Sequence, residues 1–586
     1  MLLSFLSLNS LNSPFNFSFK YFKRVFFFLL LIVVTSCNDD DVIDSEITLE
    51  PYGKEFRYSG RIVAVTIFPS NNQRMLAASP SGGLFQSDNG GRSWSPLATD
   101  KQWTYALQDV EFVPFDPNIV IATSRKDLNT EPNGGIWRSD TAGFSFVRPT
   151  SGGLPPSRSR CPIKTGAYAI SFDESLSRIY VGTDCGYAWS DDSGLTWRYK
   201  IINPNLAEGP KKLQDRVYNI AGAGQNLYAI TSDGIYFSIN GGTNWTKSTG
   251  TYESVGISMA VANAQLAVFP DNSRVALMAL DDYLTGADDT TPAPGVEFCN
   301  LFITYNGGAT WGILRTRTDT GREGLVRITP LNYKNPRGGG YTIYYGNGET
   351  VERGAISNTS MRAFRTIEWE SVNADHTDVN DLAFDPVSKA PMIMANDGGI
   401  ELNLDNNGAT FRTPRAPAPD RETDNLNGTP GLRALQVYRA IGQMKYNGSA
   451  YEHSDIYVGT HDNSLWFSKD DGANWGPFNY DPEGSIYGIL PKITDYDNSW
   501  IPHFRCWTCF KKISGPHFND SRSWTNPGSK DMSYHVVKNN NEMLQFGEIT
   551  VAGNKKTSLY YSDNLDTNWQ LIVDLDKPIW GYGLPQ

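Results

Sequence analysis

One eight-residue pattern recurs along this chain and limits the folds that it can adopt. It reads SDDSGLTW at 190–197, and related copies read SDNGGRSW, SINGGTNW, TYNGGATW, SKDDGANW and SDNLDTNW, beginning at residues 87, 238, 304, 468 and 562. Two weaker copies, SDTAGFSF and LDNNGATF, begin at residues 139 and 404. A catalytic site is usually built once, so a pattern that is present eight times indicates a scaffold element.

Each copy, called a box below, has the composition of a hairpin turn. It follows a short apolar run such as GIYFS and precedes another strand-like segment. A short Asp or Asn side chain can accept the N–H groups that a turn leaves unpaired, and Gly takes the positive-φ position. The final aromatic residue can pack against a neighbouring sheet. We therefore expect structural roles for the third residues of the boxes: Asn89, Asp192, Asn240, Asn306, Asp470 and Asn564.

The boxes resemble the Asp-box, or BNR, repeat of sialidases, sortilin-type receptors and two-propeller xyloglucanases. The resemblance spans nearly all of the chain after the N-terminal segment. It implies an all-β fold, a β-propeller of four-stranded antiparallel blades, in which the boxes are structural and lie away from the active site.

The spacing of the boxes predicts the number of blades. The first four lie about 50 residues apart, which is about one four-stranded blade each. The longer gaps after residues 304 and 468 each leave room for one blade without a box, formed by GYTIYYGNGE…RAFRTIEW and by SWIPHFRCWTCFKKISG…SRSWTN. We therefore expect about ten blades in one ring over residues 56–586. Two smaller propellers, divided near the Pro- and Asp-rich stretch 413–431, are the alternative.

The N-terminal segment has the features of an export signal. Lys20, Lys23 and Arg24 precede a ten-residue apolar run that is too short to span a bilayer as a helix. The run leads into VTSC, which resembles a bacterial lipobox and implies a signal peptide over 1–36 with lipidation of Cys37. The acidic residues 39–41 resemble the surface-export signals of Bacteroidetes lipoproteins, and residues 37–55 have the composition of a polar tether. The expected location is the outer membrane, on the cell-surface face.

Charge and cysteine content narrow the classes of function. The net charge is −12 without a basic run, which excludes the electrostatic footprint of a nucleic-acid-binding protein. An exported chain can form disulfides. Cys161 and Cys185 are one candidate pair. Cys506 and Cys509 are another, because their CWTC segment has strand composition rather than the helix N-terminus of a thioredoxin-type site.

A second short motif supplies the candidate ligand-binding residues. It reads GTDCG, TSDGI, NDGGI and HDNSL, each five to seven residues before a box or its decayed equivalent, so one strand should separate it from the box end of the blade. Carboxylates and histidine there could hold a cation or a sugar, although Asp-Gly is also ordinary turn chemistry. The candidates are Asp184, Asp233, Asp397, His461 and Asp462, together with Asp375, His376 and Asp378 of the loop NADHTDVNDLAFDP. We expect no cofactor, and a structural cation on this face is the one addition that these residues could hold.

Motifs for catalysis are incomplete. The Arg-Ile-Pro opening of sialidases matches only Arg61-Ile62, since Val63 replaces the proline. The catalytic Asp that xyloglucanases carry before the Gly-Gly of the first blade is replaced by Pro80 and Ser81. No catalytic residue can be assigned. We therefore expect a binding module for a protein partner of an outer-membrane complex or for a glycan. The alternatives are a glycoside hydrolase that acts on surface polysaccharide and an assembly factor for another membrane protein.

Overall fold

The computed structural model describes most of residues 59–414 and separate stretches between residues 429 and 575. All of its described regular structure is β-sheet except one five-residue helix, α3 (Met361–Arg365). No helix in these ranges has the length and hydrophobicity that a membrane span requires. The described strands form ten small antiparallel sheets, one of which gains a parallel edge strand.

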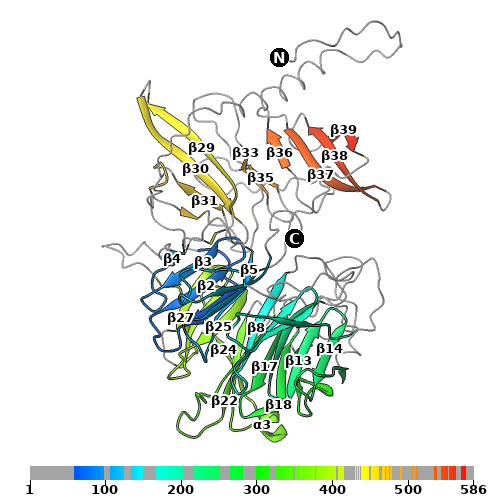
Figure 1. Cartoon of the computed structure of the whole chain (residues 1–586). Helices are drawn as coiled ribbons and strands as arrows, with labels where there is room; N and C mark the ends of the chain where they lie inside the picture. The colour runs from blue at the N-terminus through cyan, green and yellow to red at the C-terminus, as the bar shows by residue number, and fades with distance from the viewer. Residues whose placement is uncertain are drawn as a thin grey trace, which may run out of the picture. The chain divides into compact units, whose positions relative to one another are not determined.

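Seven of these sheets are the blades of a propeller over residues 64–412 (Figure 1). Blades 1 to 3 comprise β1 (Ala64–Ile67), β2 (Met75–Ser79), β3 (Gly83–Ser87), β4 (Ser95–Pro96); β5 (Leu107–Phe112), β6 (Val120–Ser124), β7 (Gly135–Ser139); and β8 (Ala167–Asp173), β9 (Arg178–Thr183), β10 (Gly186–Ser190), β11 (Arg198–Lys200). Blade 4 comprises β12 (Val217–Ala223), β13 (Asn226–Thr231), β14 (Gly234–Ser238) and β15 (Thr246–Lys247).

The remaining three blades follow in chain order. They comprise β17 (Gln265–Phe269), β18 (Asn272–Ala279), β19 (Cys299–Thr304), β20 (Thr310–Thr316), with β16 (Thr249–Gly250) parallel to β20; β21 (Leu325–Thr329), β22 (Tyr341–Gly346), β23 (Val351–Ile356), β24 (Trp369–Val372); and β25 (Val379–Phe384), β26 (Pro391–Asn396), β27 (Gly399–Asn403), β28 (Phe411–Arg412). Blade 6 has no box, as predicted for the stretch that begins GYTIYYGNGE, and α3 occupies its β23–β24 turn.

The ring closes after the seventh blade, so the prediction of about ten blades in one ring is wrong for the described residues. The first strands contact one another in the order β1, β5, β8, β12, β17, β21 and β25, and β25 contacts β1. One hydrophobic cluster joins blade 7 to blade 1 through Ile393, Ile400, Val65 and Phe85. Box spacing counts blades but carries no information on which blade meets the first one. The ring ends next to the stretch 413–431, where the alternative boundary was placed.

Three further sheets follow in the sequence. They comprise β29 (Val437–Asn447), β30 (Ala450–Thr460), β31 (Leu465–Ser468), β32 (Gly476–Pro477); β33 (Ile489–Leu490), β34 (His503–Arg505), β35 (Phe510–Lys512); and β36 (Tyr534–Val537), β37 (Met543–Val551), β38 (Asn554–Ser562), β39 (Trp569–Leu575). Ten is thus the number of described sheets, and seven is the number in the ring.

The boxes form the turns between the third and fourth strands of their blades. In blade 3 the Ser190 hydroxyl donates to Asp192 Oδ1 at 2.8 Å and accepts from Gly194 N at 2.8 Å. Thr196 N donates to the same carboxylate oxygen at 2.9 Å. Asn89, Asn240 and Asn306 accept from the equivalent positions, and Asp470 accepts from Ser468, whereas Asn564 lies outside the described residues. Burial acts to raise the pKa of Asp192, but the hydrogen bonds that Thr196 donates to its carboxylate hold this pKa below its usual range.

The glycine at the fifth position of each box in the ring lies in close contact with the preceding blade, where a side chain would not fit. Gly91, Gly143, Gly194, Gly242, Gly308 and Gly408 all have positive φ. A Cβ at Gly194 would lie 2.6 Å from Ile121 Cδ1 of blade 2, and one at Gly91 would lie 2.8 Å from Leu402 Cδ2 of blade 7. The box therefore has two structural tasks: it closes a hairpin and it allows close approach between blades.

Replacement of Asp192 by alanine is expected to destabilise the ring by about 1–2 kcal/mol, because three donors lose their acceptor. Chemical denaturation of the variant measures this loss. Asp191→Ala is the matched control, since its ion-pair partners among the described residues are Arg178 and Arg198, and such partly exposed pairs contribute little. Equal losses in the two variants would contradict the structural role of Asp192.

Candidate functional site

The predicted ligand-binding aspartates of the second motif lie at the end of the blades opposite the boxes. Asp184, Asp233 and Asp397 occupy the turns between the second and third strands of blades 3, 4 and 7. The third strand then runs to the box at the other end of the blade. This arrangement follows from the spacing seen in the sequence.

Each of these three carboxylates is held by the ring itself. Asp184 is buried and accepts from Arg216 Nε at 2.7 Å, the Tyr168 hydroxyl at 2.7 Å and Gly166 N at 2.8 Å. Asp397, also buried, contacts Arg61 at 3.3 Å and accepts from Asn380 Nδ2 at 2.9 Å.

Asp233 is more exposed, and its partners are the Tyr236 hydroxyl and Lys247 Nζ, the latter at 3.6 Å. Of these partners, Arg61 is the residue that matched the sialidase opening. In the structure it joins blade 1 to blade 7.

The loop before β25 is organised by a buried glutamate that the sequence did not single out. Glu401 accepts from the backbone N–H groups of Asp375 at 2.9 Å and His376 at 2.8 Å, and from Asn396 Nδ2 at 2.7 Å. Burial raises the pKa of Glu401 to about 7, although these hydrogen bonds act to lower it. Asp375 in turn pairs with Arg412 at 3.4 Å, and Asp378 adopts a positive φ of 57°. The loop is therefore fixed from within the blade.

Two of the candidates, His461 and Asp462, lie outside the described residues. Within the described part, no group of three or more His, Cys, Asp or Glu side chains is placed to hold a metal ion. A structural cation therefore has no donor set among the candidates that the structure describes.

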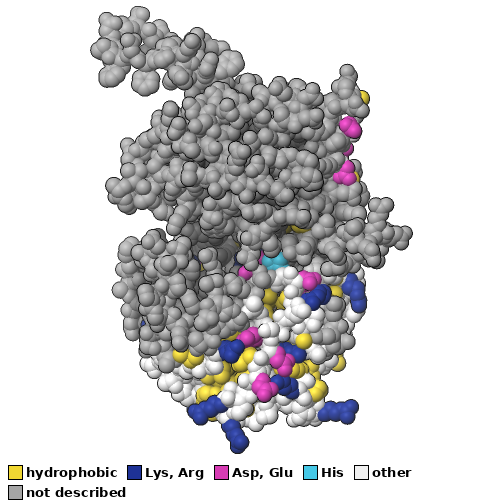
Figure 2. All heavy atoms as spheres, turned by 180° about the vertical axis from the view of Figure 1, so that it is seen from behind, with side chains coloured by type: hydrophobic (Ala, Val, Ile, Leu, Met, Phe, Trp, Pro, Cys, Tyr) yellow, Lys and Arg dark blue, Asp and Glu magenta, His cyan; other side chains and the backbone are white. Residues whose placement is uncertain are grey.

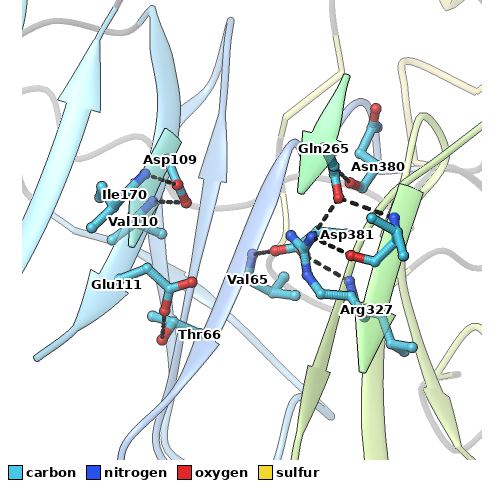
Figure 3. A network of polar contacts seen from close by, with 12 residues as sticks. Val65, Thr66, Asp109, Val110, Glu111, Ile170, Gln265, Arg327, Asn380 and Asp381 are labelled. Atoms are coloured by element: carbon cyan, nitrogen blue, oxygen red, sulfur yellow. Dashed lines mark hydrogen bonds and ion pairs between the residues drawn. The ribbon is translucent and has the colours of Figure 1, made fainter. Parts of the chain in front are cut away.

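A group of interacting charges on the first strands of the blades was missed by sequence reasoning (Figure 3). Asp109 and Glu111 come from β5, Arg327 from β21 and Asp381 from β25, all of them first strands that meet around the ring. Arg327 contacts Asp381 at 2.5 Å and also donates to Gln265 Oε1. Asp109 and Glu111 interact with the Arg327 guanidinium group electrostatically, and we call Asp109, Glu111, Arg327 and Asp381 the axial cluster.

Two aspartates of the axial cluster also join neighbouring blades. Asp109 accepts from Ile170 N of blade 3 at 2.7 Å, and Asp381 accepts from Val65 N of blade 1 at 2.9 Å. Each also accepts from the N–H of the residue that follows it, at 2.8 Å. A register shift in the strand pairing precedes both aspartates, as expected of bulges that redirect a side chain. These bonds satisfy N–H groups at the free edge of a first strand.

Glu111 has a different environment from the two aspartates. Its carboxyl accepts from the Thr66 hydroxyl at 2.7 Å. Burial, followed by the charges of Asp109 and Asp381, raises the pKa of Glu111 well above its usual range. Burial likewise raises the pKa of Asp109 to about 7. The axial cluster therefore binds protons at a pH where ordinary carboxyl groups have lost them.

A repeated strand pattern could have identified the axial cluster. LQDVEF in β5 and VNDLAF in β25 share an Asp, an aliphatic residue and a Phe at the same spacing, and both precede an Asp-Pro turn. The boxes dominate the repeat signal, so this weaker first-strand pattern is seen only once the blades are aligned.

Cys185 forms a disulfide in the structure, and its predicted partner Cys161 lies outside the described residues. We expect peptide mapping without reductant to recover a Cys161–Cys185 linked peptide. A link from Cys185 to Cys299, Cys506 or Cys509 would contradict the predicted pairing. Cys506 and Cys509 also lie outside the described residues, between the paired strands β34 and β35.

Solved structures with a similar fold share little sequence with this chain. The GH74 xyloglucanase from Xanthomonas campestris has 12% identity and a TM-score of 0.47, over 89% of this chain and 81% of that chain. The Niastella koreensis GH74 enzyme has 14% identity and a TM-score of 0.43, over 89% and 80%. PorZ, a surface component of the type-IX secretion system of Porphyromonas gingivalis, has 11% identity and a TM-score of 0.42, over 89% and 60%. No family model and no curated protein matches the chain. These values carry no activity over to this chain, and its own geometry identifies it as an all-β propeller.

Proposed function

We propose that this protein is a surface-exposed, lipid-anchored protein of the outer membrane whose propeller docks a protein partner. The anchor is the predicted lipidated Cys37. The observation that supports docking is a set of exposed apolar side chains on consecutive box turns. Phe144, Leu195 and Ile239 belong to the boxes of blades 2, 3 and 4, and are 54%, 49% and 64% exposed. Exposed apolar side chains that are presented at one end of a rigid ring can contribute to an interaction site.

The carboxylates at the opposite end of the blades do not favour catalysis. Asp184, Asp233, Asp375 and Asp397 each have a basic partner within the ring. Such pairs hold the turns in place and leave these groups committed to structure. A rigid ring that presents side chains on its turns is well suited to binding.

Co-isolation from cells tests the docking proposal. The full chain and the variant Phe144→Ser/Leu195→Ser/Ile239→Ser are extracted in mild detergent, and the accompanying chains are identified. We expect a partner with the wild-type chain that is lost from the variant. The control variant Ile313→Ser/Val387→Ser removes exposed apolar residues from blades 5 and 7 and should retain the partner. Equal recovery with both variants would contradict docking through blades 2–4.

A glycoside hydrolase is the second candidate, and the axial cluster is the observation that favours it. Such enzymes combine an acid that is protonated near neutral pH with an ionised carboxylate. Released reducing ends, measured on a panel of polysaccharides, provide the test. Turnover that Glu111→Gln abolishes, in a variant that still unfolds cooperatively and is no less stable than the wild-type chain, would replace docking by hydrolysis as the function.

A further inference from the structure

A group of arginines gathers at the box end of blades 5 and 6, apart from the apolar box turns of blades 2–4. Arg274 lies at the start of β18, just after the β17–β18 turn, Arg337 lies in the β21–β22 turn, and Arg362 and Arg365 lie in α3. Both kinds of turn, first-to-second and third-to-fourth strand, lie at the same end of an antiparallel blade. We call these four residues the basic sector.

Side-chain contacts hold the members of the basic sector on one surface. Phe364 of α3 packs against Phe269 and Tyr305 of blade 5, with ring centroids 5.6 Å apart in both pairs. Asn272 Nδ2, at the start of β18, donates to Thr359 Oγ1, just before α3, at 3.3 Å. The β21–β22 turn is tied to the same region, since Asn332 Nδ2 donates to Ile356 O at 3.0 Å.

All four arginines are exposed. No ion pair joins any of them to a carboxylate in the described residues. The neighbouring acids Glu368 and Glu370 are already paired with Lys334, and Glu370 also with Arg353. Asp271 is the remaining exposed acid on these turns that the structure describes.

The position and composition of this surface suit an anionic layer. Figure 1 places α3, β18 and β22 at the lower edge of the ring, and Figure 2 shows Lys and Arg side chains projecting from that edge. Met361, 50% exposed, stands beside Arg362 in α3. Arginine binds phosphate oxygens in a bidentate manner, and an exposed apolar residue among cations can enter a headgroup layer. The net charge of the whole chain is −12, so the basic sector is a local excess of positive charge on a protein that is acidic on average.

We propose that the basic sector docks on a membrane surface by binding the phosphate groups of anionic lipids, and so orients the propeller on the membrane to which Cys37 is predicted to tie it. The lipid anchor is part of the proposed function, but docking of a protein on blades 2–4 does not depend on this contact. The membrane is favoured over an acidic protein because the arginines spread over the turns of two blades at one end of the ring rather than lining a groove.

Vesicle co-sedimentation tests the proposal. The chain from residue 37 onward is used with Cys37→Ser, so that acyl chains do not contribute. We expect binding to phosphatidylglycerol-containing vesicles, no binding to phosphatidylcholine alone, and weakening with added salt. Each cation near an anionic surface contributes roughly fivefold to partitioning, so Arg337→Gln/Arg362→Gln/Arg365→Gln should reduce binding on the order of a hundredfold.

A matched variant separates the basic sector from net charge. Arg92→Gln/Arg198→Gln/Lys389→Gln removes the same charge from exposed positions at the box end of blades 1, 3 and 7, and should bind nearly as the parent does. Equal losses of binding in the two variants would overturn the proposal. Failure of the wild-type chain to bind the vesicles would also overturn it, and would favour an acidic protein as the partner of the basic sector. Inorganic phosphate should displace the chain no better than chloride of equal ionic strength; selective displacement would indicate a site for free phosphate instead. Partner co-isolation remains an independent readout of the proposed function.

Discussion

Gly308→Ala is expected to lower the free energy of unfolding by about 3 kcal/mol. Gly308 has a φ of 93°, and a Cβ there would lie 2.5 Å from Phe237 Cβ and 2.9 Å from Tyr228 Cε1, both in the preceding blade. The Phe237 Cβ is fixed to its backbone, and Tyr228 is fully buried. The clash can therefore be relieved only by moving blade 5 away from blade 4.

The neighbouring glycine of the same box is the matched control. Gly307 has a φ of 76°, but its nearest neighbour to an added Cβ is Asn226 Oδ1 at 3.4 Å. Gly307→Ala should therefore lose about 1 kcal/mol, from backbone strain alone. Urea denaturation of both variants gives the difference. Equal losses would show that the box glycines act through turn conformation and not through the contact between blades.

The free energy of unfolding should decrease as the pH rises from 5 to 8, and Asp109 alone should contribute about 2–3 kcal/mol of this decrease. Burial raises the pKa of Asp109 to about 7 and that of Glu111 well above its usual range. The folded ring therefore holds protons that the unfolded chain, with carboxyl pKa values near 4, has released. This stabilising difference is complete below the unfolded pKa and is lost as the pH rises through the folded values.

Glu111→Gln should flatten this dependence and stabilise the ring at pH 8. The amide keeps an oxygen that can accept from the Thr66 hydroxyl, but it removes one ionisable group from the axial cluster. Urea midpoints at a series of pH values provide the measurement. Glu174→Gln, at an exposed turn, should leave the curve unchanged. Parallel curves for Glu111→Gln and the wild-type chain would show that Glu111 is not the group that titrates.

The sequence predicted the local elements of this fold better than their closure. Ser190, Asp192 and Gly194 form their turn through contacts within eight residues, so one box is enough to predict it. Closure depends on Asp381 reaching Val65 N, a contact between residues 316 positions apart. Nothing in the box spacing encodes that contact, and the ring therefore closed three blades earlier than expected.

The candidate site shows the same division. The positions of Asp184, Asp233 and Asp397 opposite the boxes followed from strand length. Their partners Arg216, Lys247 and Arg61 come from other strands or blades. The three carboxylates are therefore held in structural ion pairs, which the sequence did not predict. The axial cluster is built from four separate blades, if Gln265 is included, so its members become neighbours only when the ring is formed.

The mass of the particle that carries the native protein tests the central claim, that this propeller works by docking a protein. Light scattering of a mild-detergent extract, with the detergent contribution subtracted, gives the protein mass. We expect a particle larger than 65.1 kDa, the mass of the 586-residue chain, that is reduced to a single chain by Phe144→Ser/Leu195→Ser/Ile239→Ser. Recovery of the wild-type protein as a lone monomer would contradict it.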